Sequence, residues 1–246
     1  MQRVKTSILP IWLMVALLTS ACGPVPAIRT VAPTLTPTGP LPVQQPVMTP
    51  TLPRPTILDV FPLAVGTTWV YSVTLDTILK DQAIHWTGVV TETITEASQQ
   101  GNGWIFRAET QGHPLQEEQP SERVQYYVAL GNRLYRLLSG ALSISVIEKN
   151  GQEYEWNQIL TWPLEVGQQW GTPEFLARGD GWYVWRAEAR ETIETLAGVF
   201  ADCYHLALWT NPDHIWAWFC PGVGLVRREY HHHGSPHDEV WVLQER

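Results

Sequence analysis

The sequence has few basic residues and no basic cluster outside its first residues. Lysine and arginine number 16 against 24 acidic residues, and the formal net charge is −8. Binding to the phosphates of nucleic acid needs clustered lysine and arginine, and no such cluster follows residue 22. We therefore expect no nucleic-acid partner.

The motifs of common catalytic centres are also missing. The sequence contains no G-x-S-x-G, S-x-x-K or H-E-x-x-H motif, no Walker phosphate-binding loop and no paired C-x-x-C. Glu188, Glu191 and Glu194 cluster, but residues 188 and 191 of a strand point to opposite faces. That alternation weakens an acid–base pair, so enzymatic activity has no positive signal, and we predict no cofactor.

The first residues have the composition of a secretory signal. Arg3 and Lys5 precede an apolar stretch, residues 8–18, that is too short to span a bilayer comfortably. The next residues, Thr-Ser-Ala before Cys22, resemble the lipobox of bacterial lipoproteins, whose cysteine becomes the acylated first residue of the mature chain. A threonine stands where that family prefers leucine, so secretion after cleavage by an ordinary signal peptidase is the alternative. We predict a signal peptide at residues 1–21 and lipidation at Cys22, which would anchor the protein to the outer side of the bacterial cell membrane.

Residues 22–56 contain ten of the 19 prolines. Because proline fixes φ and lacks an N–H, this segment can form neither helix nor sheet, and we expect a disordered stalk with polyproline II character. Loss of the signal peptide removes two basic residues and no acidic one, which leaves a net charge of −10. Such a surface repels anionic lipids, so the acyl anchor is the expected membrane contact.

Residues 57–246 have the pattern of an all-β domain. Short alternating or β-branched segments follow one another between Gly, Asn, Pro and Asp residues, and no window shows the 3.6-residue apolar period of a long helix. We predict a single antiparallel domain of about ten strands. A strongly curved sheet or half-barrel is the expected form, with a two-sheet sandwich as the alternative.

Two segments of this domain repeat. PLAVGTTW at residues 62–69 recurs as PLEVGQQW at residues 163–170, and ETIT at 92–95 recurs as ETIE at 191–194. A duplicated supersecondary unit is one interpretation. The other is a single turn device used twice, in which glycine turns the chain and tryptophan opens a strand.

The opening motif also carries a resemblance. FPLAVGTTWVYSV is similar to the segment that opens the folded domain in a group of uncharacterised bacterial lipoproteins, and PGVGLVRREY is similar to their recurrent Gly-x-Gly-Leu-Val segment. The resemblance implies a cell-surface β-sheet lipoprotein and implies nothing about a substrate.

Cys203 and Cys220 lie on two segments that TNPD, residues 210–213, connects. If this connection is symmetric, the two cysteines face each other at a non-hydrogen-bonded site, where side chains are closest. A turn with Pro212 in its second position would instead place Cys203 against Gly222. Secreted proteins meet oxidising surroundings, so we predict a disulfide; a free buried pair and a pair of metal ligands are the alternatives.

The same register gives the hairpin two apolar faces. One is core, with Tyr204, Leu206 and Leu208 against Phe219, Ala217 and Ile215. The other is aromatic, and we predict that it binds a ligand through Trp209, Trp216, Trp218 and His205. The alternative is that tryptophan fills a β core that contains only five phenylalanines and three methionines.

Four histidines occur in YHHHGSPHDE, residues 230–239. His233 and His237 have the H-x₃-H spacing of zinc sites, and His232 with His237 could flank a turn. Consecutive histidines of a strand alternate between faces, however, so the three cannot converge. We name His233 and His237 as candidate metal ligands, with a solvated loop as the alternative.

Together these features predict a membrane-anchored extracytoplasmic lipoprotein with a non-catalytic role. Its partner would be an apolar or carbohydrate ligand, or an envelope component, bound through an aromatic face. The alternatives are an extracellular hydrolase or metal-binding protein, and a purely structural envelope protein. The sequence does not indicate an oligomeric state.

Overall fold

The computed structural model describes residues 56–117, 123–138 and 157–246. All of these residues belong to one compact unit, Thr51–Arg246. The predicted signal peptide, Cys22 and the stalk up to residue 55 lie outside the described residues. In the described ranges, no helix combines the length and the apolar character needed to cross a bilayer.

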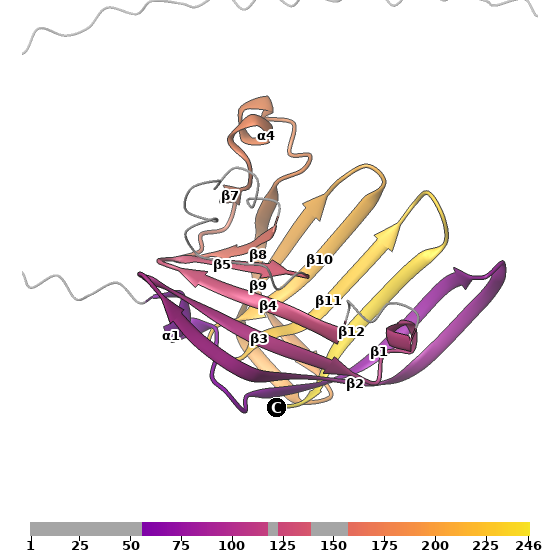
Figure 1. Cartoon of the computed structure of the whole chain (residues 1–246). Helices are drawn as coiled ribbons and strands as arrows, with labels where there is room; N and C mark the ends of the chain where they lie inside the picture. Colours follow the sequence, from indigo (N-terminus) through magenta and orange to yellow (C-terminus); the bar gives the residue numbers. More distant parts are fainter. Residues whose placement is uncertain (1–55, 118–122, 139–156) are drawn as a thin grey trace, which may run out of the picture. The chain divides into compact units, whose positions relative to one another are not determined.

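Twelve antiparallel strands form one sheet (Figure 1). The strands are β1 (Thr68–Leu79), β2 (Gln82–Gln100), β3 (Gly103–Gln111), β4 (Val124–Leu130), β5 (Arg133–Leu137), β6 (Gln158–Thr161), β7 (Gln169–Trp170), β8 (Trp185–Thr195), β9 (Gly198–Trp209), β10 (Asp213–Cys220), β11 (Gly224–His232) and β12 (His237–Glu245). The predicted all-β class is confirmed, and the single sheet excludes the two-sheet sandwich. Within the described ranges, three short helical segments, which were not predicted, accompany it: α1 (Ile57–Val60), the 3-10 helix η1 (Pro114–Glu117) and α4 (Pro173–Arg178).

The sheet consists of two meanders placed side by side. Its strand order is β6-β5-β4-β3-β2-β1-β12-β11-β10-β9-β8-β7. Within the first half, β1 to β6, each strand pairs with the next along the chain, and the second half, β7 to β12, repeats this arrangement. Pairing of β1 with β12 joins the halves, whereas β6 and β7 lie at the two edges.

The sheet is strongly curved, so that its two edges approach each other. The indole N–H of Trp170 in β7 donates to the carbonyl oxygen of Gln158 in β6 at 3.2 Å. Leu160 of β6 and Trp170 also belong to the same core cluster. Figure 1 shows the resulting curl, whose inner face carries the core.

The two PLxVGxxW segments are structurally equivalent. Gly66 donates its N–H to the carbonyl of Ile94, and Gly167 donates to the carbonyl of Ala187. The residue after each glycine accepts a bond in return from the N–H of Ile94 or Ala187. Both glycines have positive φ, +90° and +87°, which explains why glycine occupies this turn position. The equivalent of Ile94 is therefore Ala187, and the ETIT and ETIE segments do not correspond in the structure.

One end of the inner face is filled by aromatic side chains. Phe61, which follows α1, stacks on Phe219 with ring centroids 5.8 Å apart and also contacts Trp69 and Tyr127. Gly222 donates its N–H to the carbonyl oxygen of Val60 at 2.6 Å, which ties α1 to the turn before β11. This aromatic plug separates one end of the curved sheet from the rest of its inner face.

The β9–β10 hairpin has the predicted symmetric register. Thr210 donates its N–H to the carbonyl of Asp213 at 2.7 Å, and Tyr204 pairs with Phe219. Cys203 and Cys220 consequently face each other, and their sulfur atoms form a disulfide with a Cα–Cα distance of 4.2 Å. The predicted disulfide is confirmed, and the register with Cys203 against Gly222 is wrong.

Candidate binding cavity

A cavity of about 470 Å³ lies on the inner face of the sheet. Leu138 and Asn157, where two described ranges end, contribute to its wall. Its other lining residues are Thr110, His113, Leu115, Gln125, Arg136, Ile159, Trp185, Leu206, Leu208, Ile215, Ala217, Leu225, Arg228, Tyr230, His237, Glu239 and Trp241. The volume falls within the range of small-molecule sites, roughly 300–1,000 Å³.

The lining is divided by strand. The walls from β6, β8, β9 and β10 are apolar and consist of Ile159, Trp185, Leu206, Leu208, Ile215 and Ala217. The walls from β3, β4, β5, β11 and β12 carry the polar groups, which are Thr110, Gln125, Arg136, Arg228, Tyr230, His237 and Glu239. The cavity thus has an apolar side and a polar side.

A buried polar network joins the aromatic plug to the polar side. Tyr127, whose ring contacts Phe61, donates its hydroxyl to Glu92 Oε1 at 2.7 Å. Arg136 Nη2 lies 4.0 Å from Glu92 Oε2, and Arg136 Nε donates to Gln125 Oε1. Burial, reinforced by the charge of Glu92, raises the pKa of Tyr127. The network therefore keeps Tyr127 protonated and gives Arg136 one acceptor and a nearby carboxylate within the protein.

Glu239 is the carboxylate that lines the polar side of the cavity. Its Oε1 atom accepts hydrogen bonds from His113 Nε2 at 2.9 Å and from the indole N–H of Trp241 at 2.5 Å. Burial alone would raise the pKa of this carboxyl, but the hydrogen bond from His113 and the charge of Arg228 outweigh it and lower the pKa to about 2. Glu239 is ionised at neutral pH.

Arg228 lies between these two groups. Its guanidinium carbon is 4.3 Å from the ring centroid of Trp241, a cation–π contact. Burial, with the like charge of Arg136, lowers the pKa of Arg228. No acceptor among the described residues lies within hydrogen-bonding distance of its N–H groups, and no carboxylate among them lies within 4.0 Å. Arg228 therefore faces the cavity as a cation that the described protein leaves without a hydrogen-bonded anion.

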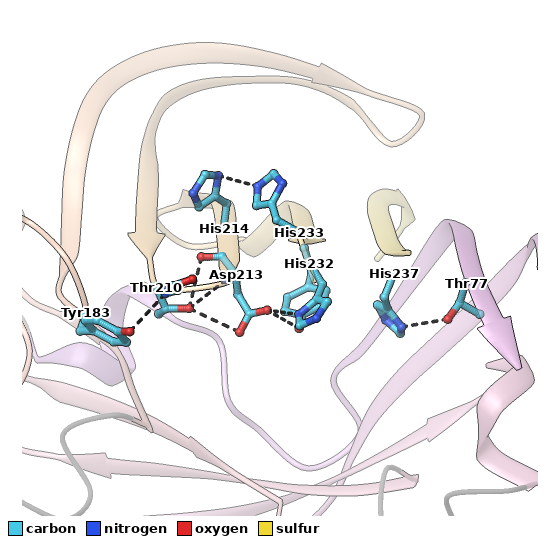
Figure 2. A network of polar contacts seen from close by, with 10 residues as sticks. Thr77, Tyr183, Thr210, Asp213, His214, His232, His233 and His237 are labelled. Carbon is cyan, nitrogen blue, oxygen red and sulfur yellow. Dashed lines mark hydrogen bonds and ion pairs between the residues drawn. The ribbon is translucent and has the colours of Figure 1, made fainter. Parts of the chain in front are cut away.

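A second polar network lies where β10, β11 and β12 end (Figure 2). Asp213 Oδ1 accepts from the hydroxyl of Tyr230 at 2.9 Å and lies 2.5 Å from His232 Nδ1. Burial opposes ionisation of Asp213, but these hydrogen bonds hold its pKa below the ordinary value. Burial and the Asp213 contact raise the pKa of Tyr230 to about 12. The network fixes the tyrosine side chain at the cavity wall.

The histidines of residues 231–237 alternate between faces, as predicted. His231 contacts Asp238, with Nδ1 2.7 Å from Oδ1, while His232 contacts Asp213. His233 Nε2 lies 3.1 Å from His214 Nδ1, and His237 Nδ1 lies 3.1 Å from the Thr77 hydroxyl (Figure 2).

The structure does not bring the predicted metal ligands His233 and His237 together. In the described ranges, no three or more His, Cys, Asp or Glu side chains are arranged to hold a metal ion. Metal binding by this pair stays a prediction that the arrangement does not favour.

The predicted aromatic site lies on the opposite face of the hairpin from the cavity. The His205 ring stacks flat on Trp218 at 4.5 Å, and the Trp218 indole donates to Glu191 Oε1 at 2.6 Å. Trp216 packs edge-on against His231, and Trp209, 39% exposed, stacks on His214. These residues form a partly exposed aromatic surface, and ligand binding there stays a prediction.

Apart from His237, which the sequence suggested only as a metal ligand, the polar cavity residues were missed because their segments look like ordinary half-exposed strands. Arg228 is one of two adjacent arginines, and sequence alone does not tell which one faces inward. Leu206 and Ala217 were predicted to face the core. Because Arg228 pairs with Ala217 across β10 and β11, it lies on the same face, and this alignment could have shown that Arg228 is the arginine that faces inward. Pairing of β11 with β12, which follow each other along the chain, then places Trp241 opposite Arg228.

No protein-family model matches the chain, and no curated protein matches it. Two solved structures do. One is a protein predicted to be exported, with a YmcC-like fold, from Bacteroides fragilis; it has 13% identity and a TM-score of 0.37, and the match covers 76% of this chain and 97% of that one. The other is a predicted lipoprotein from Parabacteroides distasonis, with 13% identity and a TM-score of 0.37 over 79% of this chain and 99% of that one. Similarity at this level says nothing about a ligand or a site.

Proposed function

We propose that this protein is an extracytoplasmic lipoprotein, anchored through acylated Cys22, whose β domain holds an apolar ligand in the inner cavity. The cavity of about 470 Å³ and its apolar side are the observation that carries the ligand proposal. The signal-like N-terminus and the resemblance to bacterial lipoproteins support the location. The disulfide is typical of proteins that reach oxidising compartments.

The role proposed is binding rather than turnover. Two carboxylates near the polar side accept hydrogen bonds from neighbours within the protein, Glu92 from Tyr127 and Glu239 from His113 and Trp241. These hydrogen bonds hold the two side chains in position, which suits a fixed binding site.

Two adjacent residues of β10 allow a direct test of the cavity. Ala217 lines the cavity and Trp216 lies on the opposite face. Fluorescence titration with N-phenyl-naphthylamine, an uncharged apolar probe, should show saturable binding to the full chain. We expect Ala217→Phe to weaken binding by about tenfold, since one added group in an apolar pocket has effects of this size. Trp216→Ala should leave binding unchanged.

The reverse pattern would move the site to the aromatic surface. If Trp216→Ala abolishes probe binding and Ala217→Phe does not, the ligand binds on the face that carries Trp209 and Trp218. Absence of saturable binding to the unaltered chain would refute an apolar-ligand function for either face.

The anchor is tested separately by fractionation of cells. The unaltered chain should sediment with membranes and incorporate labelled palmitate, whereas the Cys22→Ala chain should do neither. A stable lipid anchor requires more than one acyl chain or a second membrane contact, and an acidic domain of this net charge supplies no such contact. Unchanged membrane partitioning of Cys22→Ala would reject lipidation as the attachment.

A further inference from the structure

One cation on the polar side of the cavity has no hydrogen-bond acceptor among the described residues. Arg136 donates to Gln125 and lies 4.0 Å from Glu92. Glu239 uses one oxygen atom to accept from both His113 and Trp241. The guanidinium of Arg228 contacts the face of Trp241 and makes no hydrogen bond or ion pair with any other described side chain. A guanidinium has five N–H donors, so its position calls for an acceptor from outside the described protein.

The chemistry of that acceptor follows from the side chain. A guanidinium presents its donors as a planar fork that matches a carboxylate in a bidentate arrangement. A desolvated cation without such a partner is costly, and binding of an anion removes that cost. The most favourable occupant next to Arg228 is therefore a carboxylate.

The rest of the cavity defines the body of the ligand. The side opposite the polar strands consists of Leu206, Leu208, Ile215 and Trp185, which offer no charged group. An apolar tail against these residues removes their surface from water, at about 25 cal/mol per Å². The cavity volume of about 470 Å³ is in the lower part of the usual range for ligand sites, which favours one chain over a lipid with several.

We propose that Arg228 binds the carboxylate head of a single-chain amphiphile, of the fatty-acid class, whose tail lies against the apolar side of the cavity. The proposal rests on the proposed function, because it requires that the cavity holds an apolar ligand. It adds the head group, the residue that selects it and the orientation of the bound chain.

Isothermal titration with probes that share one tail tests the proposal. Laurate and dodecyltrimethylammonium, each below its micelle concentration, and dodecanol, below its solubility limit, are titrated into the purified full chain. The chain carries Cys22→Ala so that no acyl group of its own competes. We expect laurate to bind at least about tenfold more tightly than the other two, the gain expected from hydrogen bonds to a charged group.

Adjacent arginines provide the variant and its control. Arg228→Gln should reduce laurate affinity to that of dodecanol while dodecanol binding stays unchanged. Arg228→Lys keeps the positive charge but loses the planar arrangement of N–H donors. Its laurate affinity should lie between that of the unaltered chain and that of Arg228→Gln. Arg227→Gln is the matched control: Arg227 lies on the opposite face, over the Trp218 ring at 5.1 Å and paired with Glu229, so laurate affinity should not change.

Four results would overturn the proposal. Equal binding of laurate and dodecanol, unaffected by Arg228→Gln, would remove the carboxylate while leaving the proposed function in place. Loss of dodecanol binding in Arg228→Gln would assign Arg228 a packing role. If dodecyl phosphate binds more tightly than laurate, the preferred head group is a phosphate and the proposed carboxylate is wrong. Failure of every probe to bind would refute the proposed function itself.

Discussion

The two halves of the sheet begin in the same way and end differently. Each opens with a PLxVGxxW segment whose glycine and following residue make the same hydrogen bonds to the neighbouring strand. The first half continues into β1, twelve residues long, which pairs with β12 from Val70 to Thr77. The second half continues into β7, which has only two residues and pairs with β8 alone. One junction between the halves is therefore closed by a ladder and the other is open.

The residues after each tryptophan explain this difference. After Trp69 the chain alternates, and Tyr71, Val73 and Leu75 are buried on one face. After Trp170 come Gly171 with a φ of +151° and then Thr172 and Pro173, where Pro173 begins α4. Proline cannot donate to a ladder and is favoured in the first turn of a helix. A few residues thus decide whether the curved sheet closes at a junction.

The largest expected effect is a loss of stability when the tryptophan that ends each PLxVGxxW segment, Trp69 or Trp170, is replaced. Trp69 is 1% exposed, contacts Phe61 and donates its indole N–H to the carbonyl of Val223 at 2.9 Å. Trp69→Ala should lower the free energy of unfolding by about 3–5 kcal/mol. Trp170→Ala should cost about 2–3 kcal/mol, because neighbours at an open edge can relax into the space. Urea denaturation measures both, and equal losses would contradict the contrast between the junctions.

The second difference is covalent, because the disulfide ties only the second half. Reduction of Cys203–Cys220, or replacement of both cysteines with serine, should lower the free energy of unfolding by roughly 2–3 kcal/mol, as expected for a short closed loop. The measurement is denaturation with and without a thiol reductant. The double serine variant is the control and should show no response to reductant; a response would mean that the reductant acts elsewhere.

The third prediction concerns acid sensitivity, which Glu239 adds to the second half. Its pKa of about 2 in the folded protein lies below the ordinary value of 4.5. The carboxylate therefore contributes stability above about pH 4.5, and this is lost as the pH falls toward 2. The loss should be on the order of 2–3 kcal/mol.

Denaturation at about pH 5 and about pH 3 measures this effect. Glu239→Gln cannot ionise and should have a smaller dependence on pH over this interval. An identical pH dependence of the variant and the unaltered chain would show that other carboxyl groups dominate acid unfolding.

The smallest effect tests the equivalence of the two turns. Gly66 and Gly167 have nearly the same positive φ, and no atom lies within 4 Å of a Cβ added at either position. The cost of Gly→Ala is therefore conformational, about 1–2 kcal/mol, and should be the same at both sites. Thermal or urea denaturation of the single variants compares them. A difference larger than about 0.5 kcal/mol would mean that the turns differ in the strain they impose.

The sequence predicts the parts of the fold that depend on local pattern. Alternation identifies the strands, and the four residues from Thr210 to Asp213 predict the hairpin, its two faces and the disulfide. The short helix α4 was missed because its segment lies between strand-like residues and has no buried side chain. The predicted echo of ETIT and ETIE was misleading, because irregular pairing in β8 and the bond from Gly167 make Ala187 the partner of the turn.

The cavity depends on contacts that no local pattern contains. Arg228 and Trp241 come from the hairpin of β11 and β12, whereas Gln125 and Arg136 come from β4 and β5, and pairing of β1 with β12 joins these distant parts of the chain in one sheet. The predicted aromatic surface, in contrast, depends on local sequence alone, since Trp209, Trp216 and Trp218 belong to one hairpin. Sequence reasoning therefore found the aromatic face and missed the cavity on its other side.

The disulfide between Cys203 and Cys220 has a consequence beyond stability. In a hairpin, a slip of one residue turns every side chain to the other face of the sheet. The bond lies on the side of the hairpin away from its turn and permits one alignment of β9 with β10. Leu206 and Ala217 then face the cavity, while His205 and Trp218 face outward. The bond between two sulfur atoms thus helps to keep the wall of the cavity and the outer aromatic surface on separate faces of one hairpin.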